Sequence, residues 1–474
     1  MGSLPHREVL KEYEAWWFEG QAISDAVDQG GTPWLKMFDR FGNRVDEVRY
    51  PPEYWAMLRQ AYEAGALWRV FEEDSILPFF LLSYVTAFHD PGLSCPHTVS
   101  LSTAIPLEKY GSRELKAEYL PKMLRKEGLP WQGATWMTEV KGGSDLGGAV
   151  ETVAVPSGAR WLLTGEKYFA SNVGAELAVV AARPKGAPMN VRGLALFLLP
   201  KYRQDGSLNY TVRRIKDKTG TRSVPTGEVE FRESEAFLLG RKEQGVYLIL
   251  EVLNVSRVAN SVGSVALAQR AMADAVDFSE KRLAFGRPVL EHPLLAAQVE
   301  ERVAGLRRAF ALAWESVRLL DEVWGETYPY SERYHLFRLI AHLAKYWTAE
   351  MAALTTKWAM EVHGGIGVLK EYAVERWFRE AMVLSIWEGT SHRHILDGLE
   401  AMERKGAHRL LFDHLSDGAD RELLEKMASR VEAHLALSDT EKEGQAEPIF
   451  WDLAKFTADA LLRKRLAVLS DEES

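Results

Sequence analysis

The chain has 474 residues, of which 47% are hydrophobic and 26% are charged, so it is long enough to bury large cores in two or three domains. Its formal net charge of -9 gives no overall electrostatic attraction for nucleic acid or for an anionic membrane surface. The single cysteine, Cys95, excludes an internal disulfide bond and argues against a thiolate metal site, so we expect a cytoplasmic protein without a metal.

Residues 1–133 are expected to form an all-helical first domain. Their apolar residues recur with a helical period as far as about residue 124, and Pro51-Pro52 and Pro96 are predicted to break the helices. The first residues contain no apolar core of signal-peptide length, and the most apolar stretch, 76–88, is too short to span a bilayer. We therefore expect neither export nor a membrane span.

The period changes in residues 134–240, which are expected to form a compact β domain. Short runs rich in aliphatic and aromatic residues lie between Gly and Pro turns, a pattern typical of strands. The strands are predicted at residues 160–164, 177–181, 194–198 and 228–231.

Long helical segments return in residues 241–402, where we expect four or five helices to form a bundle. Glycine and proline interrupt the apolar pattern between these segments. The breaks are predicted at Gly286-Arg287-Pro288, at residues 325–329 and at Gly364-Gly365.

Residues 403–474 are expected to be a helical extension, with amphipathic stretches at 421–437 and 448–469 separated by the polar segment 438–445. This tail holds 11 Lys and Arg against 16 Asp and Glu, a balance of -5. Such a balance is poor for binding phosphates, and the short basic run at 463–465 is typical of a solvated helix face.

The segment Ile386-Trp387-Glu388-Gly389-Thr390-Ser391 places one carboxylate between apolar residues and a Gly-Thr turn. Desolvation disfavours the ionised form, so we expect Glu388 to have a raised pKa and to take a proton from a carbon acid near neutral pH. The segment alone also fits a helix-end carboxylate that faces water. Two motifs upstream, one at residues 363–367 and one at residues 136–145, favour the base.

Four motifs occur in a specific order: Met137-Thr138-Glu139 with Gly143-Ser144-Asp145, Arg282 with Phe285-Gly286, Gly364-Gly365, and Glu388-Gly389-Thr390. Over about residues 60–400 they resemble the acyl-CoA dehydrogenase flavoprotein family. Within that family the chain is most similar to the alkylation-response flavoproteins of the AidB type, through residues 39–46, 94–96, 216–218, 222–223, 361–362 and 386–389. The implied fold class is α+β, with an N-terminal helical domain, a middle β domain, a C-terminal helical bundle and a helical tail.

The resemblance implies that the protein binds FAD, whose ring needs hydrogen-bond donors along its edge. The matching positions in the β domain are Trp136, Thr138, Gly143, Ser144, Phe169 and Ser171. In the family, Phe169 would lie against the flavin ring and the Ser171 hydroxyl near N5. Ordinary dehydrogenases have Trp and Thr at these two positions, so Phe and Ser follow the AidB-type branch. The alternative for residues 136–144 is a plain Gly-rich turn, and the alternative for residues 167–171 is a plain β-strand with one inward aromatic residue.

The resemblance also implies cofactor contacts in the helical bundle, at Arg282, Phe285, Gly364, Gly365, Thr390 and Ser391. In the family, the arginine at the position of Arg282 reaches the cofactor of a neighbouring subunit, which implies a homodimer or a homotetramer. A helix C-terminal arginine that offsets the helix dipole is the alternative for this residue.

For the substrate, the resemblance places an acyl-CoA thioester against Ser144 and against the helical segment from Asn254 to Arg257. Arg257 lies in the middle of a predicted helix, so a buried salt bridge with a carboxylate such as Glu388 is a competing explanation. The acyl chain length depends on the registration of several helices, which a single sequence does not fix.

Two functions follow from these features. The first is FAD-dependent α,β-dehydrogenation of an acyl-CoA, as in fatty acid metabolism: Glu388 removes the α proton while a hydride leaves the β carbon for flavin N5. The resemblance implies an electron-transferring flavoprotein as acceptor. The second is an AidB-like flavoprotein associated with protecting DNA against alkylation, which the acidic tail disfavours. A protein that binds fatty acyl groups without oxidising them is a third reading that Glu388 does not decide.

Overall fold

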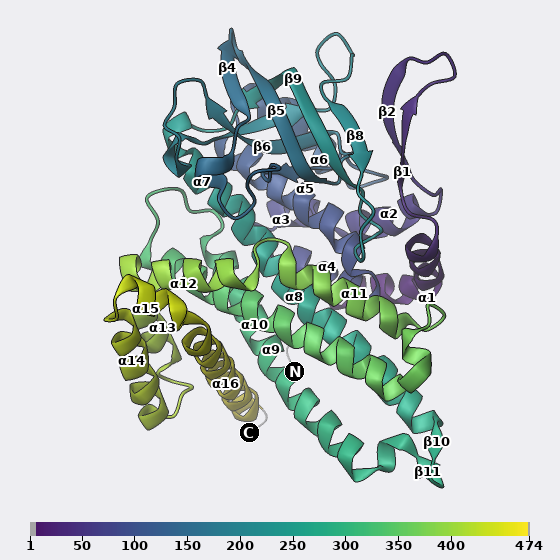
Figure 1. Ribbon diagram of the computed structural model, residues 1–474, viewed down its shortest axis with the longest axis vertical. Helices are drawn as coiled ribbons and strands as arrows, with labels where there is room; N and C mark the ends of the chain where they lie inside the picture. Colours follow the sequence, from purple (N-terminus) through teal and green to yellow (C-terminus); the bar gives the residue numbers. More distant parts are fainter. Residues whose placement is uncertain (1–5, 473–474) are drawn as a thin grey trace. The chain divides into compact units, whose positions relative to one another are not determined.

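A computed structural model describes residues 6–472, and its elements fall into two compact units (Figure 1). The N-terminal unit, Glu8–Ser256, holds the first helices and the strands of the main sheet. The C-terminal unit begins at Arg257 and holds the later helices, and the long helix α8 (Gly245–Lys281) runs from the first unit into the second. The predicted α+β order of helices, β domain and helices is confirmed.

Between residue 6 and the main sheet lie six helices, and most of α5 is buried. They are α1 (Arg7–Gln29), α2 (Tyr54–Ala64), α3 (Trp68–Glu72), α4 (Leu77–His89), α5 (Pro91–Tyr110) and α6 (Arg113–Met123). The break predicted at Pro51-Pro52 precedes α2, but the break predicted at Pro96 is wrong, because Pro96 lies inside α5. One proline costs a helix about 3 kcal/mol, and burial of residues 91–93 and 95–107 outweighs that cost here.

The prediction that the first domain is all helical is also wrong, because it contains an antiparallel hairpin of β1 (Trp34–Phe38) and β2 (Arg44–Arg49). The Asp39 carboxylate closes the turn by accepting the backbone N–H groups of Phe41 at 2.8 Å and Asn43 at 2.9 Å. The turn residues Asp39, Gly42 and Asn43 were the signal in the sequence that predicts such a hairpin.

The middle of the chain forms a seven-stranded sheet in the order β3-β6-β4-β5-β9-β7, with β8 paired to β9. Because β6 also pairs with β7, five of these strands close into a ring. The strands are β3 (Thr135–Trp136), β4 (Val153–Ser157), β5 (Arg160–Ser171), β6 (Leu177–Pro184), β7 (Ala195–Pro200), β8 (Thr211–Ile215) and β9 (Thr226–Leu238). Each of the four predicted strands overlaps one of these, and β3, β4 and β8 were not predicted.

The core of this sheet is built from apolar side chains that alternate along its strands. Trp136, Phe197 and Phe231 are fully buried, and the Trp136 ring contacts Tyr210 edge-on and Phe231 face to face. A rigid sheet of this kind fixes the loops that leave its strand ends. The loop after β3 carries the motif at residues 137–145.

Five long helices follow, as predicted, and the first four of them pack around a core that includes Leu267, Trp358 and Trp377. They are α8, α9 (Pro293–Val323), α10 (Glu332–His363), α11 (Ala373–Ile386) and α12 (Ser391–Lys405). The three predicted breaks are confirmed: the hairpin of β10 (Leu283–Ala284) and β11 (Arg287–Pro288), the α9–α10 loop, and the turn that begins at Gly364. Short helical turns lie between the strands and helices described so far: α7 (Leu146–Ala149), η1 (Val191–Gly193), η2 (Lys242–Gln244), η3 (Val289–Glu291) and η4 (Gly364–Val368).

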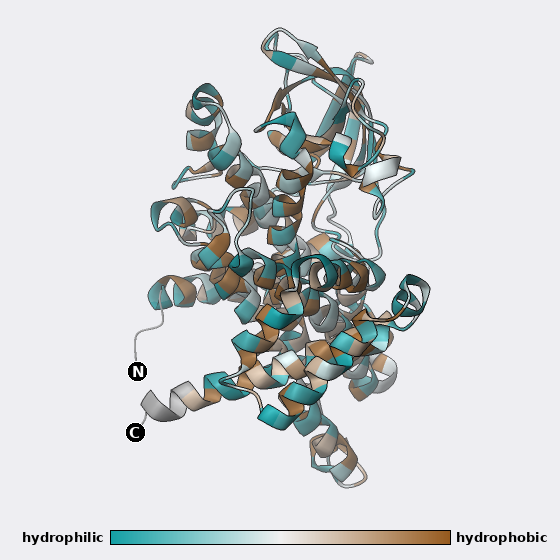
Figure 2. Cartoon of the chain, turned by 90° about the vertical axis from the view of Figure 1, so that its left-hand side faces the viewer, coloured by the Kyte–Doolittle hydropathy of each residue, from teal (hydrophilic) through white to brown (hydrophobic). Residues whose placement is uncertain are grey.

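As far as residue 472, the tail consists of four helices: α13 (Ala407–Leu415), α14 (Arg421–Leu435), α15 (Asp439–Gly444) and α16 (Ala446–Glu472). The polar segment predicted to separate two stretches contains α15, whose start is closed by a capping box between Ser438 and Glu441. Figure 2 shows apolar and polar residues side by side along the helices, as expected of amphipathic helices. The tail is held on α9 by His414, whose Nε2 lies 2.8 Å from Glu315 Oε1. No helix within residues 6–472 is both long and apolar enough to cross a membrane.

Candidate active site

Glu388 lies in the tight turn between α11 and α12, and its backbone is strained. Its φ of +59° is in the left-handed region, which non-glycine residues rarely adopt, and Gly389 follows with φ +108°. A Cβ atom on Gly389 would lie 3.0 Å from His394 Nε2, so a larger residue here would crowd that ring as well as strain the backbone. The turn therefore has little freedom to move the carboxylate.

The Glu388 side chain is half-buried, and burial raises its pKa above the usual carboxyl range. Arg257 and Lys345 oppose that shift, because each cation favours the ionised form. Among the described residues, no hydrogen bond and no ion pair reaches the Glu388 carboxylate oxygens. The carboxylate thus experiences the charge of two cations but forms no ion pair with either of them.

Arg257 lies in the middle of α8. It forms a buried salt bridge, but its partner is not the carboxylate of Glu388. Its guanidinium pairs with Asp397, with 3.3 Å between Nη2 and Oδ2, and its Nε lies 3.5 Å from the backbone carbonyl oxygen of Glu388. The salt bridge considered with the Glu388 carboxylate is therefore made with Asp397 on α12. Arg257 therefore contacts the turn that carries the base through the backbone carbonyl oxygen of Glu388, and not through its carboxylate.

Lys345 on α10 is a residue that the sequence analysis missed. It is only 1% exposed, and its Nζ donates to the carbonyl oxygens of Ser385 at 3.2 Å and Gly389 at 2.7 Å. Burial lowers its pKa to about 7, although Glu388 and Glu350 favour its charge. The signal was available, because Lys345 lies among residues 339–349, which are otherwise apolar except for His342 and Thr348.

Two buried histidines lie beside this lysine. His342 on α10 and His394 on α12 face each other with 3.1 Å between their Nδ1 atoms, and burial holds the pKa of both well below the usual range. Two imidazolium groups at this distance would repel, so the pair is neutral near physiological pH. The lysine and the arginine are therefore the cations whose charge acts on the base.

Thr390 and Ser391 follow the base at the start of α12. Thr390 occupies the N-cap position of that helix, and the Ser391 hydroxyl donates to Glu350 Oε1 at 2.6 Å. The Ser391 side chain is thus already engaged, whereas its backbone N–H is one of the four at a helix start that lack an intrahelical partner.

In the N-terminal unit, the loop after β3 is anchored by a buried ion pair. Lys167 Nζ lies 2.6 Å from Glu139 Oε1 and donates to the Met137 carbonyl oxygen at 3.1 Å. Glu139 also accepts the backbone N–H of Thr152 at 3.2 Å. Glu139 belongs to the predicted motif, but its role in holding the loop depends on Lys167, which the sequence analysis did not single out.

The remaining motif residues of this loop and of β5 are partly accessible. Thr138 is half-buried, Gly143 and Ser144 are exposed, and the Phe169 side chain is 50% exposed, with Lys216 Nζ 4.6 Å from its ring centroid. The Ser171 hydroxyl lies 3.3 Å from the Thr226 hydroxyl. An accessible aromatic ring with hydroxyl donors nearby fits the edge and face of an isoalloxazine ring.

Trp136 differs from these residues, because its side chain is fully buried in the core of the sheet. Its indole N–H donates to the Ser171 carbonyl oxygen at 2.9 Å. In this arrangement its ring supports the backbone that carries Ser171 and does not face a ligand.

The other four predicted cofactor contacts of the C-terminal unit, Arg282, Phe285, Gly364 and Gly365, are exposed and lie at or beside turns. Arg282 directly follows α8, and Phe285, at the tip of the β10–β11 hairpin, is 98% exposed with φ +51°. Gly364 ends α10 with φ +64°, and nothing lies within 4 Å of a Cβ atom built on it or on Gly365. A ligand could therefore approach this backbone closely.

The predicted residues thus form two groups, one in each compact unit. The structure brings together Glu388, Arg257, Thr390 and Ser391 in the C-terminal unit, and the loop after β3 with the end of β5 in the N-terminal unit. The predicted substrate residues Ser144 and Asn254 belong to the N-terminal unit, and Asn254 is only 2% exposed within α8. No cluster of His, Cys, Asp or Glu in the described part of the chain is arranged to hold a metal ion.

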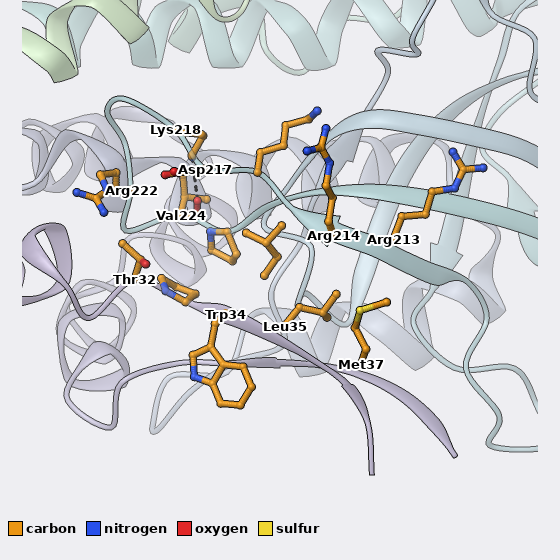
Figure 3. A pocket seen from close by; sticks show the side chains of 14 residues that line it. Thr32, Trp34, Leu35, Met37, Arg213, Arg214, Asp217, Lys218, Arg222 and Val224 are labelled. Carbon is orange, nitrogen blue, oxygen red and sulfur yellow. Dashed lines mark hydrogen bonds between the residues drawn. The ribbon is translucent and has the colours of Figure 1, made fainter. Parts of the chain in front are cut away.

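A separate recess of about 400 Å³ in the N-terminal unit includes residues 216–218 and 222 of the AidB-like motifs (Figure 3). It is lined by Thr32, Pro33, Trp34, Leu35, Met37, Arg213, Arg214, Ile215, Lys216, Asp217, Lys218, Arg222, Val224 and Pro225. Arg214 and Lys216 share Glu228, each 2.7 Å from its Oε1, and Lys218 donates to the Thr221 and Val224 carbonyl oxygens. Most of its positive charge is therefore neutralised or saturated within the protein.

Three family descriptions match consecutive parts of the chain. The adaptive response protein AidB N-terminal domain matches residues 5–127, the acyl-CoA dehydrogenase middle domain matches 134–234, and the acyl-CoA dehydrogenase C-terminal domain matches 243–403. The order is the one that the motifs predicted, and the likeness to the AidB-type branch is confirmed.

Known proteins agree with these matches. Acyl-CoA dehydrogenase family member 11 of Caenorhabditis elegans is 30% identical over 85% of this chain and 68% of that protein. The putative acyl-CoA dehydrogenase AidB of Escherichia coli (strain K12) is 29% identical over 81% of this chain and 71% of that protein. The structure of Caenorhabditis elegans ACDH-11 in complex with C11-CoA has a TM-score of 0.84 at 25% identity, covering 96% of this chain and 82% of that chain. The chain therefore belongs to the acyl-CoA dehydrogenase family.

Proposed function

We propose that the protein is an FAD-dependent acyl-CoA dehydrogenase in which Glu388 is the base that removes the α proton of an acyl-CoA thioester. The observation that carries this proposal is the half-buried Glu388 carboxylate, whose pKa is raised and which lies on a strained turn without a hydrogen-bond partner in residues 6–472. The family membership and the relative solved with C11-CoA support an acyl-CoA as substrate.

The residues around Glu388 suit proton abstraction from carbon. The α C–H of a thioester is a weak acid, so an efficient base must be ionised at working pH and yet bind a proton well. Burial raises the proton affinity of Glu388, and Arg257 and Lys345 limit the rise so that an ionised fraction remains. FAD, when bound, supplies the acceptor for the hydride that leaves the β carbon.

We propose FAD contacts for each unit separately. The hydroxyl groups of Thr138 and Ser171 and the exposed loop at Gly143 and Ser144 would meet the polar edge of the ring, while Phe169 would cover part of its face. Trp136 would act through its bond to the Ser171 carbonyl oxygen. From the C-terminal unit the proposal takes Arg282, Phe285, Gly364, Gly365, Thr390 and Ser391.

For the substrate we retain Ser144 and Asn254 as proposed contacts of the thioester or its CoA part. The contacts of Arg257 with Asp397 and with the Glu388 carbonyl oxygen support a second role, in which it shapes the turn of the base. The two roles are compatible, because a guanidinium group carries five N–H donors.

The exposed β10–β11 hairpin supports the proposal that the protein works as a homodimer or a homotetramer. Leu283 is 66% exposed and Phe285 is 98% exposed, and an apolar tip of this kind is typical of a surface that a second subunit covers. In that arrangement Arg282, beside the hairpin, would reach a neighbouring cofactor, as the family implies. We propose an electron-transferring flavoprotein as the electron acceptor.

The match of residues 5–127 to the AidB N-terminal domain favours a second candidate, a flavoprotein associated with protection of DNA and having little dehydrogenase activity. The tail, with its balance of -5 by 11 Lys and Arg against 16 Asp and Glu, offers little for phosphates. Binding of duplex DNA measured at rising salt concentration distinguishes the two candidates, because phosphate contacts give a steep loss of affinity.

The test of the first candidate is anaerobic titration of the flavin-loaded protein with acyl-CoAs of different chain length, followed by flavin absorbance. We expect one chain-length class to bleach the flavin, and Glu388→Gln to slow bleaching by about 10²- to 10⁴-fold, the usual contribution of a general base. Glu400→Gln on α12 is the matched control, because this glutamate pairs with Arg404 at the protein surface. A flavin that stays oxidised with every acyl-CoA, or equal rates in Glu388→Gln and wild type, would overturn the proposal.

A further inference from the structure

The ammonium group of Lys345 lies beneath the turn that carries Glu388. Its Nζ reaches the carbonyl oxygens of Ser385, 3.2 Å away, and Gly389, 2.7 Å away, so its two backbone partners lie on either side of Glu388 in the sequence. Lys345 comes from a different helix, α10, in a stretch that is buried from residue 339 to residue 349. One side chain thus ties both ends of a five-residue segment to a rigid helix.

Both carbonyl groups need an outside donor. Ser385 lies in the last turn of α11, which ends at Ile386, and the last four carbonyl groups of a helix lack intrahelical partners. Gly389 follows the left-handed Glu388, where the chain reverses before α12. A lysine ammonium carries three N–H donors and no acceptor, so it can satisfy both oxygens at once.

Burial and the charged groups around Lys345 together set how strongly it holds its proton. On α8, Arg257 faces it and is paired with Asp397 of α12. On its own helix lie neutral His342 and the carboxylate of Glu350, and on α12 lies neutral His394. The Glu388 carboxylate and Glu350 both favour the charge of Lys345 and Arg257 opposes it, so with burial the pKa is lowered to about 7.

Packing alone does not call for a lysine at this position. An unbranched apolar side chain such as methionine would fill similar volume on α10 without the cost of burying a cation. The presence of a cation at this position is therefore explained by its contacts with the two carbonyl oxygens and by its electrostatic interaction with the Glu388 carboxylate.

We propose that Lys345 is a positioning residue for Glu388, whose ammonium group clamps the Ser385 and Gly389 carbonyl oxygens, fixes the left-handed turn and favours the ionised base. This inference rests on the proposed function for its catalytic consequence only. The clamp itself is a property of the folded turn and can be measured without substrate.

The clamp is tested by hydrogen–deuterium exchange of the flavin-loaded protein, read in peptides that cover residues 385–392. In Lys345→Met we expect these amides to exchange about tenfold faster or more, because hydrogen bonds to a charged donor are lost, while peptides from α9 stay unchanged. Lys357→Met is the matched control, since Lys357 lies on the same helix but pairs with Glu361 at the surface. Unchanged exchange at 385–392 in a folded Lys345→Met protein would overturn the clamp.

Should Lys345→Met fail to fold, Lys345→Gln replaces it in the test. This variant keeps two N–H donors but carries no charge. With either variant, the pH profile of acyl-CoA-dependent flavin reduction gives the second readout. We expect its acidic limb to move up by about one pH unit, since the cation that favours ionised Glu388 is gone. An unmoved limb would overturn the effect on the base. Equal bleaching rates in Glu388→Gln and wild type would instead show that the proposed function fails, while the exchange data still decide the clamp.

Discussion

Two buried lysines of this protein each lie near a glutamate, but only one of them forms an ion pair with it. In the N-terminal unit, Lys167 pairs directly with Glu139, with 2.6 Å between Nζ and Oε1. In the C-terminal unit, Lys345 binds two backbone carbonyl oxygens and leaves the Glu388 carboxylate unpaired within residues 6–472. Both lysines lose proton affinity by burial, and both hold a loop that carries predicted site residues.

The difference separates a structural carboxylate from a reactive one. Glu139 accepts Lys167 and also the backbone N–H groups of Glu151 at 2.6 Å and Thr152 at 3.2 Å, so its lone pairs are occupied. Glu388 is held through its backbone, on a strained turn, with a raised pKa. A protein that needs a base can thus fix the main chain and leave the side-chain oxygens available to substrate.

The largest effect on stability is expected from breaking the direct pair. Glu139→Gln leaves the Lys167 ammonium buried without a counter-charge, so we expect the free energy of unfolding to fall by about 3–5 kcal/mol. Guanidinium denaturation followed by tryptophan fluorescence measures this change. The double variant Glu139→Gln with Lys167→Met should recover part of the loss, because no buried charge remains. A loss below about 1 kcal/mol would mean that the two lysine sites do not differ in the way described.

The second prediction uses the pH dependence of stability at the other lysine. Burial lowers the pKa of Lys345 from 10.5 to about 7, so between these values the unfolded chain holds a proton that the folded chain lacks. The free energy of unfolding must then rise with pH in this window, by about 1.4 kcal/mol per pH unit for this group. We expect the stability of wild type relative to Lys345→Met to increase by about 2.5 kcal/mol from pH 8 to pH 10.

Urea denaturation of both proteins at several pH values between 7.5 and 10 measures this slope. Lys357→Met, at an exposed position of the same helix, should show no such trend relative to wild type. Parallel stability curves for wild type and Lys345→Met would show that Lys345 keeps an ordinary pKa.

The smallest effect is expected at a third Lys–Glu pair, which is exposed. Lys141 and Glu151 lie 2.7 Å apart at the surface, with side chains 69% and 58% exposed. Water and salt screen such a pair, so Lys141→Met should leave the unfolding curve within the error of the measurement. A clear loss of stability would mean that burial is not what distinguishes the three pairs.

Much of the fold could be predicted from the sequence, because hydrophobic period and breakers carry the information. The long helices and the turns at Gly286 and Gly364 were located in this way. The β1–β2 hairpin was missed, since its strands are short and only the turn around Asp39 marks it. Pro96 was misread as a break, because tertiary burial outweighs the local cost of a proline.

The candidate site divides along a similar line. Glu388 could be singled out because its neighbours in the sequence are apolar, and the motifs at residues 137–145 have a recognisable spacing. Lys345 and Asp397 lie 43 residues before and 9 residues after the base, and only the packing of α10 and α12 brings them to its turn. Partners contributed by separate helices leave no local pattern, although an ionisable residue within an apolar run marks a position that needs an explanation.

The most direct test of the base is exchange of the α hydrogens of a bound thioester with solvent. A 3-thiaacyl-CoA has sulfur in place of the β carbon, so it can give up an α proton but no hydride. In deuterated buffer we expect wild type and Glu400→Gln to introduce deuterium at the α carbon, read by NMR, and Glu388→Gln to slow this by about 10²-fold or more. Undiminished exchange in Glu388→Gln would contradict the assignment of Glu388 as the base.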